Sequence, residues 1–298
     1  MHVRYRKRAF SVLFILMLTI WPICPAYAAE SDSCRAVIGA DLTEEQIHNV
    51  YTLFGISRGD VPELRLTNAE EREAMKGFVD EAVLGTKTIS CVYLELLPQG
   101  SGFDVRLENI SWCTPEMYIN ALETVGVQDA RLVVAAPVTV SGTGAIAGIY
   151  KAYEDMTDTG IDEQAKEAGT QELTVTGELA EDIGVNDSAT IVSELKEMLN
   201  ETANMTDDDI RETVRTIAER HKVRLTDAQV EQLLDLCRTL EKLDPDTLKK
   251  RVENVQETFQ RVEETKDQVV GFFESIKQLI STLESFMEKL NGFFGGRT

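Results

Sequence analysis

The spacing of hydrophobic and polar positions changes along the chain, and the change predicts its architecture. Up to about residue 155, short apolar runs typical of strands alternate with helical patterns, whereas beyond it almost every pattern is helical. The sequence therefore predicts an α+β fold. Its expected parts are a mixed α/β sheet domain over residues 29–156, a helical region over 157–243, and a long amphipathic, coiled-coil-like helix with a Gly-rich tail over 244–298.

Capping signals mark where the helices are expected to begin. Thr43 precedes Gln46 by three residues, which is the spacing of a capping box, and Thr226 and Gln229 repeat this pattern. Independent use of a good helix start explains the repeat better than duplication, because nothing else repeats. The other expected starts are Asn68 for a helix over 69–78, Thr114 with Pro115 for 115–125, Ser141 for 141–153, Asp187 or Ser188, and Thr206.

Two strand-like runs, residues 88–97 and 103–112, flank a turn signal at residues 99–102 and predict a β-hairpin. Cys91 lies in the first run and Cys113 follows the second. In a simple hairpin register the two cysteines would be about 10 Å apart, too far for a disulfide unless the chain bends. Cys237 has apolar neighbours at helical spacing and is expected to be a buried thiol. With Cys34, the four cysteines beyond residue 28 leave the disulfide pairing open, and few or no disulfides are expected.

Residues 1–28 have the composition of an export signal. Four basic residues within positions 4–8 precede an apolar run over 9–23, and Ala26-Tyr27-Ala28 has the form of a cleavage site. A retained membrane anchor is disfavoured because the run is short and prolines interrupt its end. The sequence thus predicts a protein that is secreted or associated with the cell envelope.

Removal of that segment would make the chain more acidic. The full chain has 30 Lys and Arg residues against 51 Asp and Glu, a net charge of −21; loss of the four basic residues gives 26 against 51, or −25. Such a charge disfavours nucleic acid as a partner and repels anionic lipid. It leaves basic proteins, cationic wall components or divalent cations as electrostatic partners, although it also serves solubility alone.

The longest regular pattern lies near the C-terminal end. From Leu248 to Phe294 apolar residues follow a four-three spacing, with Lys266 as its one polar exception, which predicts a coiled-coil-like seam. Beyond Lys266 the apolar stripe broadens, to more than a two-stranded seam requires. The stripe over residues 266–294 is expected to pack on the preceding helices, to bind a protein or cell-wall component, or to lie on a membrane surface.

The most suggestive chemical motif is a glycine turn that follows a strand pattern and opens a helix. Its residues Ser141, Gly142, Thr143 and Gly144 are candidates for an anion site, because glycines there let an anion approach the amides of a helix N-terminus. The spacing G-x-G-x-x-x-G differs from the dinucleotide fingerprint, and no lysine supports a P-loop. The turn therefore predicts no particular cofactor.

Packing is the alternative explanation of that turn, since Ala145, Gly148 and Ala152 form a small-residue face for close helix contact. Catalysis has little support. The histidines of the expected mature chain, His48 and His221, are not paired with a nucleophile by any recognisable pattern, and the cysteines lack metal-ligand spacing. The three aspartates after Thr206 suit the first turn of a helix and lack the calcium-loop spacing. No catalytic residue, metal site or cofactor is predicted.

Three segments carry a more specific pattern: residues 39–46 (GADLTEEQ), 85–90 (GTKTIS) and 130–154 (ARLVVAAPVTVSGTGAIAGIYKAYE). In these segments the chain resembles the exported proteins of Gram-positive bacteria (Firmicutes) catalogued as domain of unknown function 1002, the YpuA type. The resemblance extends from about residue 33 to the helical tail, and the four cysteines beyond residue 28 depart from it. It implies a secreted or envelope-associated protein, and it assigns no catalytic or ligand-binding residue.

Together these patterns predict a non-enzymatic extracytoplasmic module that interacts with a protein or the cell envelope. The alternative is a ligand-binding protein or hydrolase that uses the glycine turn at residues 141–148. The two hypotheses differ in an observable way. An enzyme or ligand-binding protein needs a polar concave site at this turn, whereas an interaction module is compatible with a buried turn.

Overall fold

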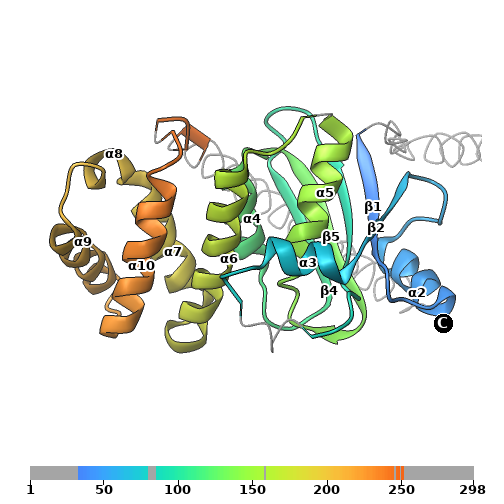
Figure 1. The fold of residues 1–298 in the computed structure, drawn as a ribbon, viewed down its shortest axis with the longest axis horizontal. Coiled ribbons are helices and arrows are strands. Elements are labelled where there is room, and N and C mark those ends of the chain that lie inside the picture. The colour runs from blue at the N-terminus through green and yellow to red at the C-terminus, as the bar shows by residue number, and fades with distance from the viewer. Residues whose placement is uncertain (1–32, 80–84, 158, 245, 249, 252–298) are drawn as a thin grey trace, which may run out of the picture. The chain divides into compact units, whose positions relative to one another are not determined.

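The computed structural model describes residues 33–251 except 80–84, 158, 245 and 249. The predicted export signal and the apolar stripe over residues 266–294 lie outside the described residues. Within them, five strands form one mixed sheet and helices cover it (Figure 1), so the α+β prediction is confirmed. The strands are β1 (Cys34–Gly39), β2 (Glu63–Leu66), β3 (Cys91–Leu96), β4 (Phe103–Ile110) and β5 (Ala130–Val140).

The predicted hairpin is wrong, because β3 and β4 are not neighbours. The strand order is β2-β1-β3-β5-β4, with β5 antiparallel to β3 and parallel to β4. The reason is burial: β5 is apolar and nearly all buried over its first seven residues, so it takes an inner position, whereas β4 alternates and lies at the edge. Two strand spacings, about 10 Å, therefore separate β3, which contains Cys91, from β4, which precedes Cys113.

Alternate residues of the central strands face two helical layers. Tyr93 on β3 faces α2 (Glu44–Phe54), where its ring lies 6.2 Å from that of Phe54. The neighbouring Val92 and Leu94 belong to the core on the opposite face, with Tyr118 of α4. The helices on that face are α3 (Asn68–Ala74), α4 (Pro115–Val125) and α5 (Ala145–Thr157).

Most capping predictions are confirmed. Thr43, Thr114, Thr206 and Thr226 each accept a hydrogen bond from a backbone amide of the first helical turn. Three helix starts differ from the prediction. Thr67 rather than Asn68 caps α3, which ends at Ala74 rather than at residue 78, and α5 begins at Ala145 rather than at Ser141 because β5 continues to Val140. Helix α7 begins at Val185, before the expected Asp187 or Ser188, and has no side-chain cap.

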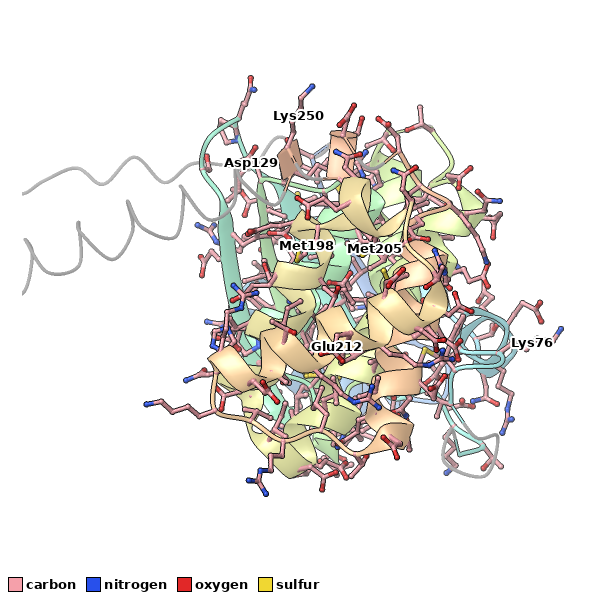
Figure 2. All side chains as sticks on the ribbon, turned by 90° about the vertical axis from the view of Figure 1, so that its left-hand side faces the viewer. Lys76, Asp129, Met198, Met205, Glu212 and Lys250 are labelled. Carbon is pink, nitrogen blue, oxygen red and sulfur yellow. The ribbon has the colours of Figure 1, made fainter. Side chains whose placement is uncertain are left out.

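The helical region packs against the sheet layer through α6 (Glu163–Ile183). One side of α6 places Leu173 in the core of the sheet layer, and another places Val175 and Leu179 in the helical core. The remaining helices are α7 (Val185–Glu197), α8 (Leu199–Thr202), α9 (Asp207–Arg220) and α10 (Asp227–Leu240). Their outer surface carries many charged side chains, among them Glu212 on α9 (Figure 2).

Candidate functional site

The glycine turn between β5 and α5 is buried rather than open. Gly142 has φ +97°, and its carbonyl accepts a hydrogen bond of 2.6 Å from the hydroxyl of Tyr118. A side chain at this position would collide with Ile110 and Tyr118. Ser141 is exposed, and its hydroxyl lies 3.2 Å from that of Thr143. Packing and a left-handed backbone conformation thus account for the first glycine.

A carboxylate of the protein itself lies against the second glycine of the turn. Glu71 on α3 is only 7% exposed, and a Cβ on Gly144 would overlap its carboxylate. Burial raises the pKa of Glu71, although a hydrogen bond donated by the Thr88 hydroxyl acts in the opposite direction. A second anion at the amino end of α5 would have to lie beside this group. Glu71 would therefore compete with an anion bound at residues 141–144, and the anion site stays a prediction.

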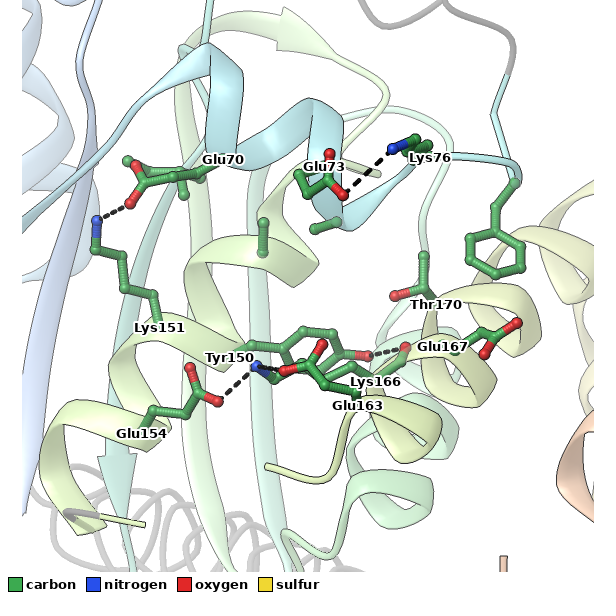
Figure 3. Close-up of a pocket in the computed structure, with 14 residues that line it drawn as sticks. Glu70, Glu73, Lys76, Tyr150, Lys151, Glu154, Glu163, Lys166, Glu167 and Thr170 are labelled. Carbon is green, nitrogen blue, oxygen red and sulfur yellow. Dashed lines mark hydrogen bonds and ion pairs between the residues drawn. The ribbon is translucent and has the colours of Figure 1, made fainter. Parts of the chain in front are cut away.

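A second feature, which we call the α3–α5–α6 cleft, is open to solvent and has a volume of about 710 Å³. Figure 3 shows α3 on one side, α6 on the other and α5 between them. Leu66, Ala74, Phe78, Ala147 and Tyr150 supply its apolar parts. Its charged lining consists of Glu70, Glu73, Lys76, Lys151, Glu154, Glu163, Lys166 and Glu167.

Ion pairs connect the charged side chains of the cleft. Lys166 Nζ lies 2.6 Å from Glu154 Oε1 and 3.0 Å from Glu163 Oε1. Burial alone would lower the pKa of Lys166, but hydrogen bonds to both carboxylates outweigh it and raise that pKa. Lys151 Nζ lies 2.6 Å from Glu70. Burial would raise the pKa of Glu70, but hydrogen bonds from Lys151 and from the capped backbone outweigh it and hold the value at about 2.

A second cluster of lysine and glutamate, the sealed cluster, is buried where α4, α6 and α7 meet. Lys196 Nζ on α7 lies 2.9 Å from Glu172 on α6 and 3.4 Å from Glu123 on α4. It also donates to the carbonyl of Asn120, and the Thr124 hydroxyl donates to Glu172. The side chain of Lys196 is 1% exposed and that of Glu172 is not exposed.

Two carboxylates share one ammonium group in this sealed cluster, so one of them keeps its proton most readily. Burial raises the pKa of Glu123 to about 7; Lys196 lowers it and the neighbouring Glu172 raises it further. Burial also raises the pKa of Glu172, against the attraction of Lys196. Lys196 lies closer to Glu172 than to Glu123, so its ammonium group stabilises the charged form of Glu172 more strongly.

The four cysteines that the structure describes are buried thiols, none of them in a disulfide. Burial raises the pKa of Cys91, Cys113 and Cys237 to about 12, so all three are protonated near neutral pH and poor nucleophiles. Cys237 lies in the helical core, as predicted. Across the described ranges, no group of three His, Cys, Asp or Glu side chains is arranged to hold a metal ion.

Neither histidine of the described chain adjoins a serine or cysteine nucleophile through a hydrogen bond. His221 Nε2, at the end of α9, lies 2.6 Å from a carboxylate oxygen of Glu194, and His48 lies exposed on α2.

No helix within the described part is long and apolar enough to cross a membrane.

Sequence patterns did not identify the cleft. Its α6 residues Glu163, Lys166, Glu167 and Thr170 share one helix face at the i, i+3, i+4, i+7 spacing, but that helix was not delimited from the sequence. The approach of α3 to this face depends on tertiary packing. A local signal for α6 did exist in Asp162, which caps the helix by accepting from the amides of Gln164 and Ala165.

The fold and these sites define an acidic α+β protein with a mixed five-stranded sheet, a helical region and a charged cleft. The model of the family described as "Protein of unknown function (DUF1002)" matches residues 38–257, and the chain belongs to this family. It is similar to the uncharacterized protein YpuA of Bacillus subtilis (strain 168), with 32% identity over 281 residues, which cover 94% of this chain and 92% of that protein. No solved structure matches the chain.

Proposed function

We propose that the protein is an exported, non-enzymatic module that binds a protein or wall component of the cell envelope. Burial of the glycine turn is the observation that carries this proposal. A ligand-binding protein or hydrolase built on this turn needs an open polar concavity, but Gly142 and Gly144 are buried, and Tyr118 and Glu71 fill the space around them.

The apolar surface of the described body adds support. Among the residues described, Val138 is the one large hydrophobic residue that is exposed, with 54% of its surface accessible to solvent. The body therefore offers little apolar area for the stripe over residues 266–294 to cover. A stripe of this kind binds better to a partner that supplies an apolar surface.

The test replaces part of the stripe and measures association with the cell envelope. Phe273, Ile276 and Ile280 are changed together to Asn, and a matched control changes the neighbouring polar residues Ser275, Gln278 and Ser281 to Asn. After crosslinking in the native cells and fractionation, the stripe variant should lose its crosslinked partner and most of its envelope association. The control should keep both.

Two outcomes would contradict the proposal. If the crosslinks and the fractionation of the stripe variant are unchanged, the stripe does not have the proposed interaction role. A fall in the thermal unfolding midpoint of the stripe variant, with partner binding retained, would show instead that the stripe packs on the body of the same chain.

A further inference from the structure

The balance of charges in the α3–α5–α6 cleft indicates what it can bind. Five glutamates and three lysines line it, which leaves an excess of two carboxylates. Lys166 is held by Glu154 and Glu163, and Lys151 by Glu70 together with the carbonyl of Arg65. An anionic ligand would have to displace these carboxylates from the lysines, which opposes anion binding.

A cation meets weaker competition. Glu167 is exposed and makes no hydrogen bond or ion pair with another residue that the structure describes. Glu73 has one partner, Lys76, at 3.5 Å, and their side chains are 76% and 72% exposed. Such an exposed pair contributes little, so an incoming ammonium or guanidinium group can replace Lys76 at low cost.

Those two glutamates come from opposite walls of the cleft. Figure 3 shows Glu73 on the α3 side and Glu167 on the α6 side, with Tyr150 on the α5 side. Ala74 and Phe78, the partly exposed apolar residues of the lining, can receive the alkyl stem of a lysine while its ammonium group remains at the charged rim. The net charge of the chain attracts cations from a distance.

We propose that the α3–α5–α6 cleft binds a basic peptide segment in an extended form. Glu73 and Glu167 receive its lysine or arginine head groups, and the apolar parts of the cleft receive the stems. A volume of about 710 Å³ falls within the range of specific ligand sites and exceeds what one side chain fills, which favours several residues of a peptide over a single amine.

The proposal is tested by titrating the full chain with a short fluorescent peptide of alternating lysine and alanine. The cleft variant combines Glu73→Gln with Glu167→Gln, and the control combines Glu212→Gln with Glu219→Gln on α9. Both remove two exposed charges, so long-range attraction falls equally. We expect about a tenfold weaker affinity for the cleft variant and less than about a threefold change for the control.

A third variant separates a cation site from an anion site. Lys166→Met keeps the stem but leaves Glu154 and Glu163 without their shared ammonium group. Affinity for the basic peptide should rise about threefold or more, because two further carboxylates become available. An anion site would instead lose affinity for a matched glutamate–alanine peptide.

Four results would overturn the proposal: no saturable binding of the basic peptide, an equal loss in the cleft and α9 variants, tighter binding of the glutamate–alanine peptide, or binding of spermidine as tight as that of the peptide. The last would identify a free polyamine as the ligand. The Asn variant of the stripe at residues 273, 276 and 280 should bind the basic peptide normally, so this test and that of the envelope role can fail separately.

Discussion

Helix α6 contributes to two clusters of lysine and glutamate that differ in their access to water. In the sealed cluster, Lys196 is 1% exposed and lies between Glu172 and Glu123. In the cleft, Lys166 is 22% exposed and pairs with Glu154 and with Glu163, which is 87% exposed. The residue types and the pair distances are alike, while the surroundings are not.

This difference decides what each cluster contributes. A buried charge that loses its partner has no water to replace it, so the sealed cluster couples α4, α6 and α7 through a large energetic penalty for separation. Charges at the open rim are solvated and screened, so they contribute little to folding and remain available to a ligand. Stability is therefore expected to depend on the sealed cluster, and recognition on the cleft that contains the second cluster.

The largest expected effect comes from Lys196→Met, which leaves Glu172 without its partner. The free energy of unfolding should fall by about 3–5 kcal/mol, measured by urea denaturation at neutral pH. Lys166→Met in the cleft is the matched control and should cost less than about 1 kcal/mol. Adding Glu172→Leu to Lys196→Met should recover part of the loss. Equal losses for the two lysine variants would remove the distinction between the clusters.

The pH dependence of stability is the next largest effect. Because the pKa of Glu123 is raised in the folded state from its ordinary value of 4.5 to about 7, its contribution is fully present below pH 4.5 and is lost as the pH rises through 7. Between these values the unfolding free energy should fall by about 1 kcal/mol per pH unit relative to Glu123→Gln. Parallel pH profiles for the two proteins would show that this carboxyl does not titrate as described.

A third effect tests the buried acid beside the glycine turn. Gly144→Ala places a methyl group on the Glu71 carboxylate and should cost about 2 kcal/mol. Gly160→Ala, where the nearest atom lies 4.0 Å away, should change stability by less than about 0.5 kcal/mol. Adding Glu71→Ala should reduce the cost of Gly144→Ala. If the two costs simply add, the turn does not enclose this carboxylate.

The smallest effect concerns salt. Raising the ionic strength to about 1 M should weaken the ion pairs of the cleft rim but change the unfolding free energy of Lys166→Met and of the unchanged protein alike. A stability difference between these two proteins that disappears with salt would mean that the cleft pairs contribute to folding after all.

Local chemistry explains which structural features were predictable. Thr43, Thr206 and Thr226 cap helices through hydrogen bonds within three residues, so the sequence alone located them. The place of β5 between β3 and β4 depends on which strand is most deeply buried, a property of the whole sheet. The long-range pair of Lys196 and Glu123 and the meeting of α3 with α6 had no local signal, so neither the sealed cluster nor the cleft could be inferred.

A crystal structure of the full chain with the lysine–alanine peptide would distinguish the two clusters most directly. We expect a peptide ammonium group within hydrogen-bond distance of Glu73 and Glu167, its stem against Phe78, and the sealed cluster around Lys196 unchanged. A peptide bound to other surface acids, such as Glu212, with the cleft empty, would contradict the assignment of recognition to the cleft.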